Sequence, residues 1–441
     1  MMNSTLPQLI RQAQILLPDG SFLLGDLLIA EGVIQAIAPE IVAPPNSSII
    51  DAAGLTLLPG VIDPQVHFRE PGLEHKEDLA TASRACARGG VTAFLEMPNT
   101  KPLTITQATL EDKLQRAAAK SLVNYGFFIG ATPENLPDLR TAHPTCGIKI
   151  FMGSAHGDLL VSQEAALEPI FAEGSRLIAV HAEDQARILE RRKLFAGITD
   201  PAVHSQIQDE ECALNATKLA LKLSEKYQRR LHILHLSTGI EATYLRDHKP
   251  AWVTAEVTPQ HLLLNTNAYA EIGTLAQMNP PLRSPENNDV LWQALLDGVI
   301  DCIATDHAPH TLAEKAQTYP QSPSGMPGVE TALPLMLTQA MQGRCTVAQV
   351  VNWMSTAVAK AYNIPNKGLI QVGYDADLIL VDLTHYHPVL RSEVQSKCGW
   401  SSFEGWSLTG WPVMTIVNGE VVFNRGEFND QVRGKALTFQ S

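Results

Sequence analysis

The middle of the chain alternates between short apolar runs and amphipathic segments. The runs lie between residues 57 and 309 and read LLPGVIDPQVHF, VTAFLEMP, VNYGFFIG, CGIKIFMG, RLIAVHAE, RLHILHLST, WVTAEVTP and DCIATDHAP. Between several of them lie segments typical of helices, such as KEDLATASRACARGG and ECALNATKLALKLSEKYQRR. Alternation of this kind predicts a parallel sheet whose strands are connected by helices. Eight repeats fit a closed (β/α)8 barrel of the TIM type.

The two ends of the chain have a different pattern. Residues 1–57 contain short apolar runs separated by turn residues, and the segment from residue 366 onwards resembles them. In that second segment Asn418-Gly419 lies between two apolar runs, which is a strong hairpin signal. We therefore predict an α/β protein with a barrel over residues 58–365. Residues 1–57 and 366–441 together should form a small β-sandwich domain.

Charge and composition narrow the classes of partner. The chain has 46 acidic and 33 basic residues, a formal net charge of −13, which argues against nucleic acids and anionic membranes. A small anionic substrate remains compatible, because one or two placed arginines can bind a carboxylate. We expect no secretory signal and no transmembrane helix, since neither pattern is present. Six cysteines without CxxC spacing indicate reduced thiols and a cytoplasmic protein.

Polar residues follow nearly every predicted strand. They are His67, Arg69, Asn99, Lys149, His181, His235, Asp306 and His310. In barrels of this type the active site lies at the carboxyl ends of the strands. One histidine at such a position is usually structural, but a set on different strands is hard to explain that way. The pattern predicts an active site at this end of the barrel.

The residue types in this set indicate a metal centre. Imidazole and carboxylate groups at His67, His181, His235 and Asp306 suit a divalent zinc ion. Lys149 would be a poor ligand when protonated, but a lysine carboxylated on its ε-nitrogen supplies two oxygens that can bridge two metals. Asp306 could also act as a general acid/base beside a metal-bound water. A lysine and an aspartate that only hydrogen-bond at strand ends are the alternatives.

Another group of residues suits an anionic substrate. Arg69 can bind a carboxylate through two parallel hydrogen bonds, and Asn99 can donate through its amide. His310 and Asn279 lie in segments that could contact the same ligand, although solvated loop residues are the alternative. Whether residues 154–160 form a mobile lid stays open at this point. The histidines not assigned to the site are His156, His204, His232 and His261, and His232 should face away from His235 on its strand.

Taken together, these motifs resemble a known family. The run GVIDPQVHFREPGLEHKEDLATASRACARGGVTAFLEMPNTKP is similar to the dihydroorotase signature of the amidohydrolase superfamily. GIKIFMGS, VHAE, LHLST, MNPPLR, ATDHAPH and GYDADLILVD continue the resemblance in order, over almost the whole chain. The resemblance implies reversible cyclisation of N-carbamoyl-L-aspartate to L-dihydroorotate in pyrimidine biosynthesis.

The resemblance also implies a role for each residue. His67, Lys149 and Asp306 would hold a first zinc ion, and carboxylated Lys149 with His181 and His235 a second, giving one or two ions per subunit. Asp306 would be the general acid/base. The substrate carboxylate would be bound by Arg69, Asn99 and His310, with Asn279 near the pyrimidine ring. A homodimer and contact with aspartate transcarbamoylase are implied partners.

One position departs from the family pattern. The usual first-strand motif is His-x-His, whereas this chain has Gln65-Val66-His67. A glutamine offers a neutral carbonyl oxygen, so the first metal site could be weak, completed by water, or empty. Two other functions stay open. One is a hydantoinase or allantoinase type of cyclic amidase, and the other is a non-catalytic scaffold that supports aspartate transcarbamoylase.

Overall fold

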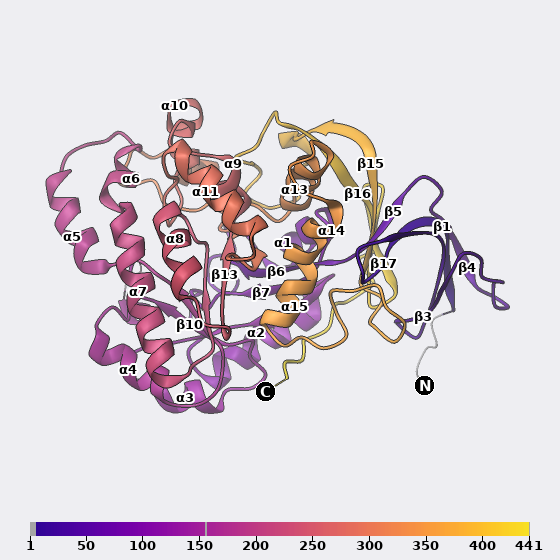
Figure 1. Ribbon diagram of the computed structural model, residues 1–441, viewed down its shortest axis with the longest axis horizontal. Coiled ribbons are helices and arrows are strands. Elements are labelled where there is room, and N and C mark those ends of the chain that lie inside the picture. Colours follow the sequence, from indigo (N-terminus) through magenta and orange to yellow (C-terminus); the bar gives the residue numbers. More distant parts are fainter. Residues whose placement is uncertain (1–5, 155–156, 441) are drawn as a thin grey trace.

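The computed structural model describes residues 6–154 and 157–440. Figure 1 shows two regions side by side: parallel strands surrounded by helices, and a mainly antiparallel sheet built from strands near both ends of the chain. The helices and the apolar faces of the parallel strands share one large core. This arrangement confirms the predicted fold class.

The parallel strands form a barrel. They are β6 (Val61–Val66), β7 (Val91–Glu96), β8 (Asn124–Phe127), β9 (Ile129–Gly130), β10 (Ile148–Phe151), β11 (Ile178–His181), β12 (Leu231–Ile233), β13 (Val253–Val257) and β14 (Cys302–Ile303). Only Phe128 separates β8 from β9, so the two continue one barrel strand. The barrel closes where Val66 bridges His307 in parallel and the His67 amide donates to the His307 carbonyl at 2.7 Å. Each predicted apolar run contains a strand.

Helices cover the outside of the barrel, as the sequence predicts. Helix α1 (Leu79–Arg88) begins at Asp78, whose side chain accepts from two backbone amides. Helix α7 (Glu210–Tyr227) begins at Asp209, whose side chain accepts from the Cys212 amide. The others are α2 (Gln107–Lys120), α3 (Leu136–Thr141), α4 (Glu164–Ala172), α5 (Gln185–Leu194), α6 (Val203–Ile207), α8 (Gly239–His248), α9 (Pro259–Leu263), α10 (Ala268–Ile272), α11 (Pro285–Leu296), α12 (Leu312–Lys315), α13 (Ala332–Met341), α14 (Val347–Val351) and α15 (Ala357–Ala361). Short 3₁₀-helices occur at η1 (Gly157–Leu159), η2 (Gly273–Ala276) and η4 (Arg391–Glu393), and η3 (Asn352–Thr356) is a π-helical turn.

The second sheet joins both ends of the chain. It contains β1 (Gln8–Leu16), β2 (Phe22–Ala30), β3 (Val33–Ala38), β4 (Ser48–Asp51), β5 (Thr56–Pro59), β15 (Leu378–Pro388), β16 (Ser407–Val417), β17 (Glu420–Asn424) and β18 (Glu427–Phe428). The amino-terminal and carboxyl-terminal halves meet where β5 pairs with β15. The predicted hairpin turn connects β16 to β17, with positive φ at Asn418 and Gly419. The exact domain boundaries stay predictions.

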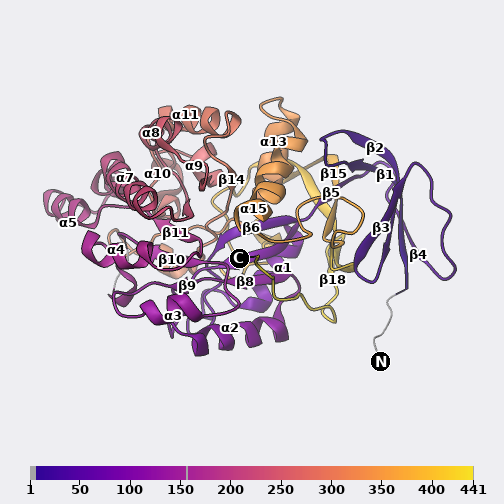
Figure 2. The ribbon, with the colours of Figure 1, turned by 60° about the horizontal axis from the view of Figure 1, so that its bottom comes forward.

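The amino-terminal end of the barrel is closed by other elements. Ala359 of α15 and the neighbouring Tyr362 pack with apolar residues inside the barrel. The carboxyl-terminal segment runs across this end, where the Leu437 amide donates to Tyr125 and the Gln440 amide to Asn363 (Figure 2). The candidate site residues lie at the opposite end. Among the helices described, none combines the length and apolarity that crossing a bilayer requires.

Candidate active site

The carboxyl ends of the barrel strands bring the predicted residues together. His67 follows β6, His181 ends β11, His235 lies just beyond β12, and Asp306 lies just beyond β14. All of these side chains are buried, and Lys149 within β10 is fully buried. Parallel pairing places Lys149 and Phe151 opposite Ala179 and His181 on β11. The strand register therefore brings residues far apart in the sequence to one end of the barrel.

Three site residues adopt a backbone conformation that side chains disfavour. The φ angles are +69° at Arg69, +36° at His235 and +46° at Asp306. Left-handed backbone is uncommon for residues other than glycine, and such residues cluster at functional sites. Each of the three follows a barrel strand, so the chain leaves regular strand geometry where its polar groups are needed.

His67 and Asp306 form one pair of potential metal ligands. Nε2 of His67 lies 3.0 Å from Oδ1 of Asp306, and Nε2 of the Gln65 side chain donates to the same oxygen at 3.1 Å. Oε1 of Gln65 is buried and has no hydrogen-bond partner among the described residues. Burial lowers the pKa of His67, although Asp306 opposes that shift. Gln65 therefore lies where a first-strand ligand would be expected, with its carbonyl oxygen unused.

His181 and His235 form the other pair. Nδ1 of His181 lies 2.8 Å from Nε2 of His235, and Nε2 of His181 lies 2.7 Å from a Glu183 oxygen. Glu183 also accepts a hydrogen bond from the Ser154 hydroxyl at 2.6 Å. Burial holds the pKa of His235 well below its ordinary value, and the nearby His181 and Lys149 lower it further. Glu183 was not predicted, although its place two residues after His181 in the VHAE motif could have indicated it.

Lys149 lies between the two pairs. Its Nζ is buried without a hydrogen-bond partner in the described part of the chain and sits 4.5 Å from the centre of the Phe151 ring. Burial lowers the pKa of Lys149 to about 7, and the charge of Asp306 acts in the opposite direction. A large share of the amine is therefore neutral at neutral pH, and no described residue is a hydrogen-bond partner for its nitrogen.

Cationic side chains gather beside the first pair. Arg69 donates through Nε to the Pro309 carbonyl at 3.1 Å, and its Nη2 lies 3.2 Å from Nε2 of His310. On the other side of that ring, Nζ of Lys76 lies 3.1 Å from Nδ1. Burial and these cations hold the pKa of His310 far below its ordinary value, so the ring is neutral. Lys76 was not predicted, because nothing in the sequence links it to His310.

Asn99 and Asn279 lie at different parts of the same end. Oδ1 of Asn99 lies 2.7 Å from Nδ1 of His67, which directs its NH2 group elsewhere. Oδ1 of Asn279 lies 2.8 Å from Nε2 of His204, a histidine that the sequence did not assign. Burial lowers the pKa of His204, so its ring is neutral, although the nearby negative charge of Glu183 opposes this shift. Residues 155–156 lie outside the described residues. The possible lid over residues 154–160 therefore falls partly outside them, and His156 wholly.

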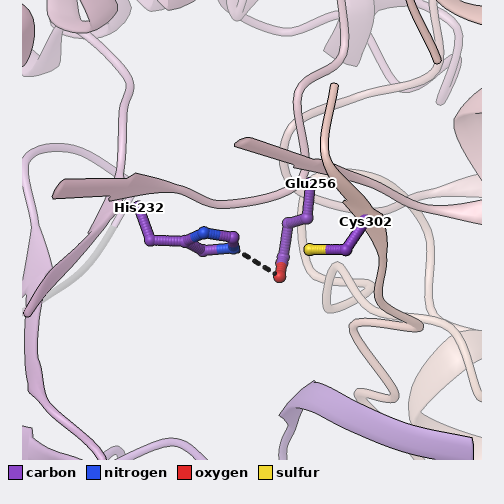
Figure 3. A group of neighbouring side chains, drawn as sticks. All are labelled: His232, Glu256 and Cys302. Carbon is purple, nitrogen blue, oxygen red and sulfur yellow. Dashed lines mark hydrogen bonds and ion pairs between the residues drawn. The ribbon is translucent and has the colours of Figure 1, made fainter. Parts of the chain in front are cut away.

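A separate trio of potential ligands lies deeper in the barrel. Ligand atoms of His232, Glu256 and Cys302 all lie within 4.8 Å of one another (Figure 3). Both ring nitrogens of His232 already have partners, Thr254 Oγ1 at 2.6 Å and Glu256 Oε2 at 2.9 Å. The prediction that His232 faces away from His235 is wrong. His232 lies inside the barrel, and strand alternation ends at Ile233 before the chain turns at His235. The trio is a satisfied internal network.

The chemistry of the predicted donor set fits a divalent metal. Two imidazole nitrogens 2.8 Å apart face each other, whereas nitrogens bound to one tetrahedral zinc lie about 3.3 Å apart. A small opening of the pair would accommodate an ion. The same holds for the nitrogen and oxygen of His67 and Asp306. Lys149, with its unused Nζ, feels the charge of Asp306 in one pair and lowers the pKa of His235 in the other.

Comparisons with known proteins agree with this geometry. A model described as the amidohydrolase family matches residues 56–422. The dihydroorotase of Methanosarcina mazei is 37% identical over 429 residues, 93% of each chain, and that of Methanosarcina acetivorans is 37% identical over 420 residues, 92% of this chain and 89% of the relative. Among solved structures, the L-hydantoinase (dihydropyrimidinase) from Arthrobacter aurescens has a TM-score of 0.93 at 31% identity and covers 98% of this chain and 100% of its own. The chain therefore belongs to the amidohydrolase family, among the members named dihydroorotase.

Proposed function

We propose that the protein is a dihydroorotase, which interconverts N-carbamoyl-L-aspartate and L-dihydroorotate plus water in pyrimidine biosynthesis. The single observation that carries this proposal is the position of Arg69. Its guanidinium lies beside neutral His310, and His310 is contacted by Lys76. His67 lies two residues before Arg69, and its Nε2 is 3.0 Å from Oδ1 of Asp306, which follows the neighbouring strand β14. Cationic side chains thus adjoin the candidate metal ligands, as binding of a ring that bears a carboxylate requires.

The residues that would hold metal follow from the two pairs. His67 and Asp306 would hold one zinc ion, and His181 and His235 another, with carboxylated Lys149 between them. Zinc bound there would supply Lewis acidity to the substrate carbonyl and lower the pKa of bound water. The buried Nζ of Lys149 without a protein partner supports carboxylation, because a neutral amine is the form that adds carbon dioxide.

Asp306 would move the proton. In ring closure it takes the proton from the attacking ureido nitrogen and delivers it to the departing oxygen of the side-chain carboxyl group, so that water leaves. In ring opening the same carboxylate takes a proton from the attacking water and gives it to the leaving nitrogen. Gln65 and His67 both approach its Oδ1, which leaves Oδ2 for this transfer.

Arg69, Asn99 and His310 would bind the carboxylate that stays outside the reaction. Arg69 offers a planar pair of donors. The Asn99 oxygen is engaged by His67, so its NH2 group is directed to a ligand. His310 and Lys76 extend the positive end of this pocket. Asn279, held by His204, would contact the pyrimidine ring.

A second candidate function is a hydantoinase type of cyclic amidase. Similarity to the L-hydantoinase (dihydropyrimidinase) structure, with a TM-score of 0.93, favours it. Hydantoin and allantoin lack the ring carboxylate that Arg69 would bind, so comparing turnover of dihydroorotate, hydantoin and allantoin separates the two functions. Gln65 is the sole support for a non-catalytic scaffold.

The test uses zinc-loaded, full-length protein. We expect it to close N-carbamoyl-L-aspartate at mildly acidic pH and to open dihydroorotate at alkaline pH. Asp306→Asn should lower kcat by about 10²–10⁴-fold, whereas Asp297→Asn, an exposed residue at the end of α11, should not change it. Metal-loaded wild type that leaves both substrates unchanged overturns the proposal.

Compartment and assembly belong to the same proposal. All six cysteines are free and buried, which supports a cytoplasmic protein, because a reducing compartment keeps thiols unpaired. A homodimer and contact with aspartate transcarbamoylase also stay predictions. Light scattering of the purified protein and co-purification from cells would test them.

A further inference from the structure

A second pocket lies at the amino-terminal end of the barrel, opposite the candidate active site. Its volume is about 430 Å³. Several of its lining residues immediately precede barrel strands: Gly147 precedes β10, Arg176 and Leu177 precede β11, and Arg230 precedes β12. Phe439 and Gln440, in the carboxyl-terminal segment that crosses this end of the barrel, complete the lining (Figure 2). The pocket is therefore formed by strand starts and the end of the chain.

The lining of this pocket is cationic in an acidic protein. Arg140, Arg176 and Arg230 contribute guanidinium groups, and the residues described as lining it include no aspartate or glutamate. Arg140 is neutralised by Glu173, at 2.6 Å. For Arg176 and Arg230, no carboxylate oxygen lies within 4.0 Å in residues 6–154 and 157–440. Within the described residues, two cations without a carboxylate partner thus line one cavity of a chain whose net charge is −13.

Hydrogen bonding leaves these cations incompletely satisfied. Nη1 of Arg176 is buried, and no atom of the described chain is a hydrogen-bond partner for it. Arg230 donates through Nη2 to the Ala361 carbonyl at 2.6 Å, which fixes its position at the wall. Behind them Arg229 donates to the carbonyls of Glu173 and Gly174, and Arg176 is close enough to lower its pKa. Arg230 is thus fixed at the wall, and Arg176 has donors that no described residue uses, an arrangement that suits an anion.

Two further features indicate what kind of anion fits. Tyr362 lines the pocket, and its hydroxyl is buried without a partner among the described residues. A neighbouring cavity of about 490 Å³ shares Leu177 and Arg230 with this pocket, and its lining includes Trp252, Trp353, Lys360 and Asp301. Both volumes are in the range of small-molecule sites. The first cavity suits a charged group, and the second suits an organic remainder.

We propose that this pocket binds the phosphate group of a small organic phosphate, between Arg176 and Arg230. Guanidinium groups match the geometry of phosphate oxygens and bind them through charge-assisted hydrogen bonds. The aromatic wall of the neighbouring cavity lies next to Arg230, where the rest of such a molecule would extend. The site is independent of the active site, because the two lie at opposite ends of the barrel.

The test measures binding by the zinc-loaded, full-length protein. Isothermal titration uses orthophosphate, pyrophosphate and a nucleoside monophosphate, each at constant ionic strength. Arg176→Gln and Arg230→Gln should each weaken binding about tenfold, the loss of roughly one charged hydrogen bond. Arg11→Gln, at an exposed arginine on β1, is the matched control and should bind as the wild type does. Arg69→Gln should also bind normally.

The other outcomes are equally decisive. Tighter binding of the nucleoside monophosphate than of orthophosphate identifies an organic phosphate as the ligand, as proposed. Equal affinity for all three probes identifies a free phosphate site and overturns the organic part of the proposal. Loss of binding in Arg69→Gln, with Arg176→Gln unaffected, assigns the anion to the active site and overturns the whole proposal. Arg230→Lys keeps the charge and should retain part of the affinity, which separates a lost contact from a misfolded variant.

Discussion

A buried ion pair behind the candidate active site allows a quantitative prediction. Nζ of Lys113, on α2, lies 2.7 Å from Oε2 of Glu96, at the end of β7, and the side chains are 1% and 0% exposed. Lys113 also donates to the Met97 carbonyl at 3.1 Å. The other oxygen of Glu96 accepts from the Phe68 amide, between His67 and Arg69, at 3.0 Å. The pair therefore connects a helix to the segment that carries the site.

The substitution Lys113→Met keeps the volume and leaves Glu96 buried without its cation. Removing one partner of a buried pair costs about 3–5 kcal/mol. For a chain of 441 residues, the entropy of unfolding near the melting temperature is about 0.9 kcal/mol per degree. The expected decrease in Tm is therefore about 3–5 °C. Burial raises the pKa of Glu96 and Lys113 opposes that shift, so the variant should lose more stability at pH 8 than at pH 6.

Calorimetry at one scan rate measures this decrease, with Lys222→Met as the matched control. Nζ of Lys222 lies 2.6 Å from Glu164, closer than in the buried pair, but the side chains are 63% and 45% exposed. Exposed pairs contribute about 0–1 kcal/mol, so the control should change Tm by about 1 °C or less. Equal shifts in both variants would refute the reasoning that burial, not distance, determines the cost. Glu96 accepts a hydrogen bond from the Phe68 amide, beside the site residues His67 and Arg69. Lys113→Met should therefore also lower kcat/KM in assays at temperatures well below the Tm of the variant.

Other predictions concern the substrate, the metal and pH. Arg69→Gln should raise KM for dihydroorotate about 10–100-fold with a much smaller change in kcat, because a charged hydrogen bond to the carboxylate is lost. Steady-state kinetics measures both constants, and an unchanged KM would contradict this role of Arg69. Gln65→His supplies an imidazole in place of a neutral carbonyl, so the variant should retain zinc at about tenfold higher chelator concentration, measured by metal analysis. Burial raises the pKa of Glu330 from 4.5 to about 7, so its contribution to stability is complete below about pH 4.5 and is lost as the pH rises to about 7. The wild type loses about 3 kcal/mol over that range, so Tm of Glu330→Gln minus that of the wild type should grow by about 3–4 °C between pH 5 and pH 8, and a constant difference would contradict the raised pKa.

Much of the fold could be predicted from local sequence. Each apolar run that the sequence indicated contains a barrel strand, and Asn418-Gly419 forms the expected turn. Short apolar runs, helix-capping residues and turn residues act over a few positions, so their effect can be read without knowing the partners. That both ends of the chain form β-structure was also predicted. Their junction through β5 and β15 came from the three-dimensional arrangement.

The candidate site was partly predictable for the same reason. Residues that end barrel strands, such as His67, His181 and Asp306, share one end of the barrel because parallel strands run in one direction. Lys76 was missed because its contact with His310 depends on where separate segments meet. Glu183 was missed although it lies only two residues after His181, which it contacts.

The sequence by itself determined the order of strands and helices and the end of the barrel where polar groups gather, because both follow from hydrophobic period and chain direction. Tertiary structure alone decided how those groups pair. His232 illustrates the difference: alternation placed it on the wrong face, since the chain leaves strand geometry before His235 and reaches it with a φ of +36°. Tertiary structure also decided that Arg176 and Arg230 share a pocket without a carboxylate. Side-chain pairing depends on distances between segments that no local pattern encodes.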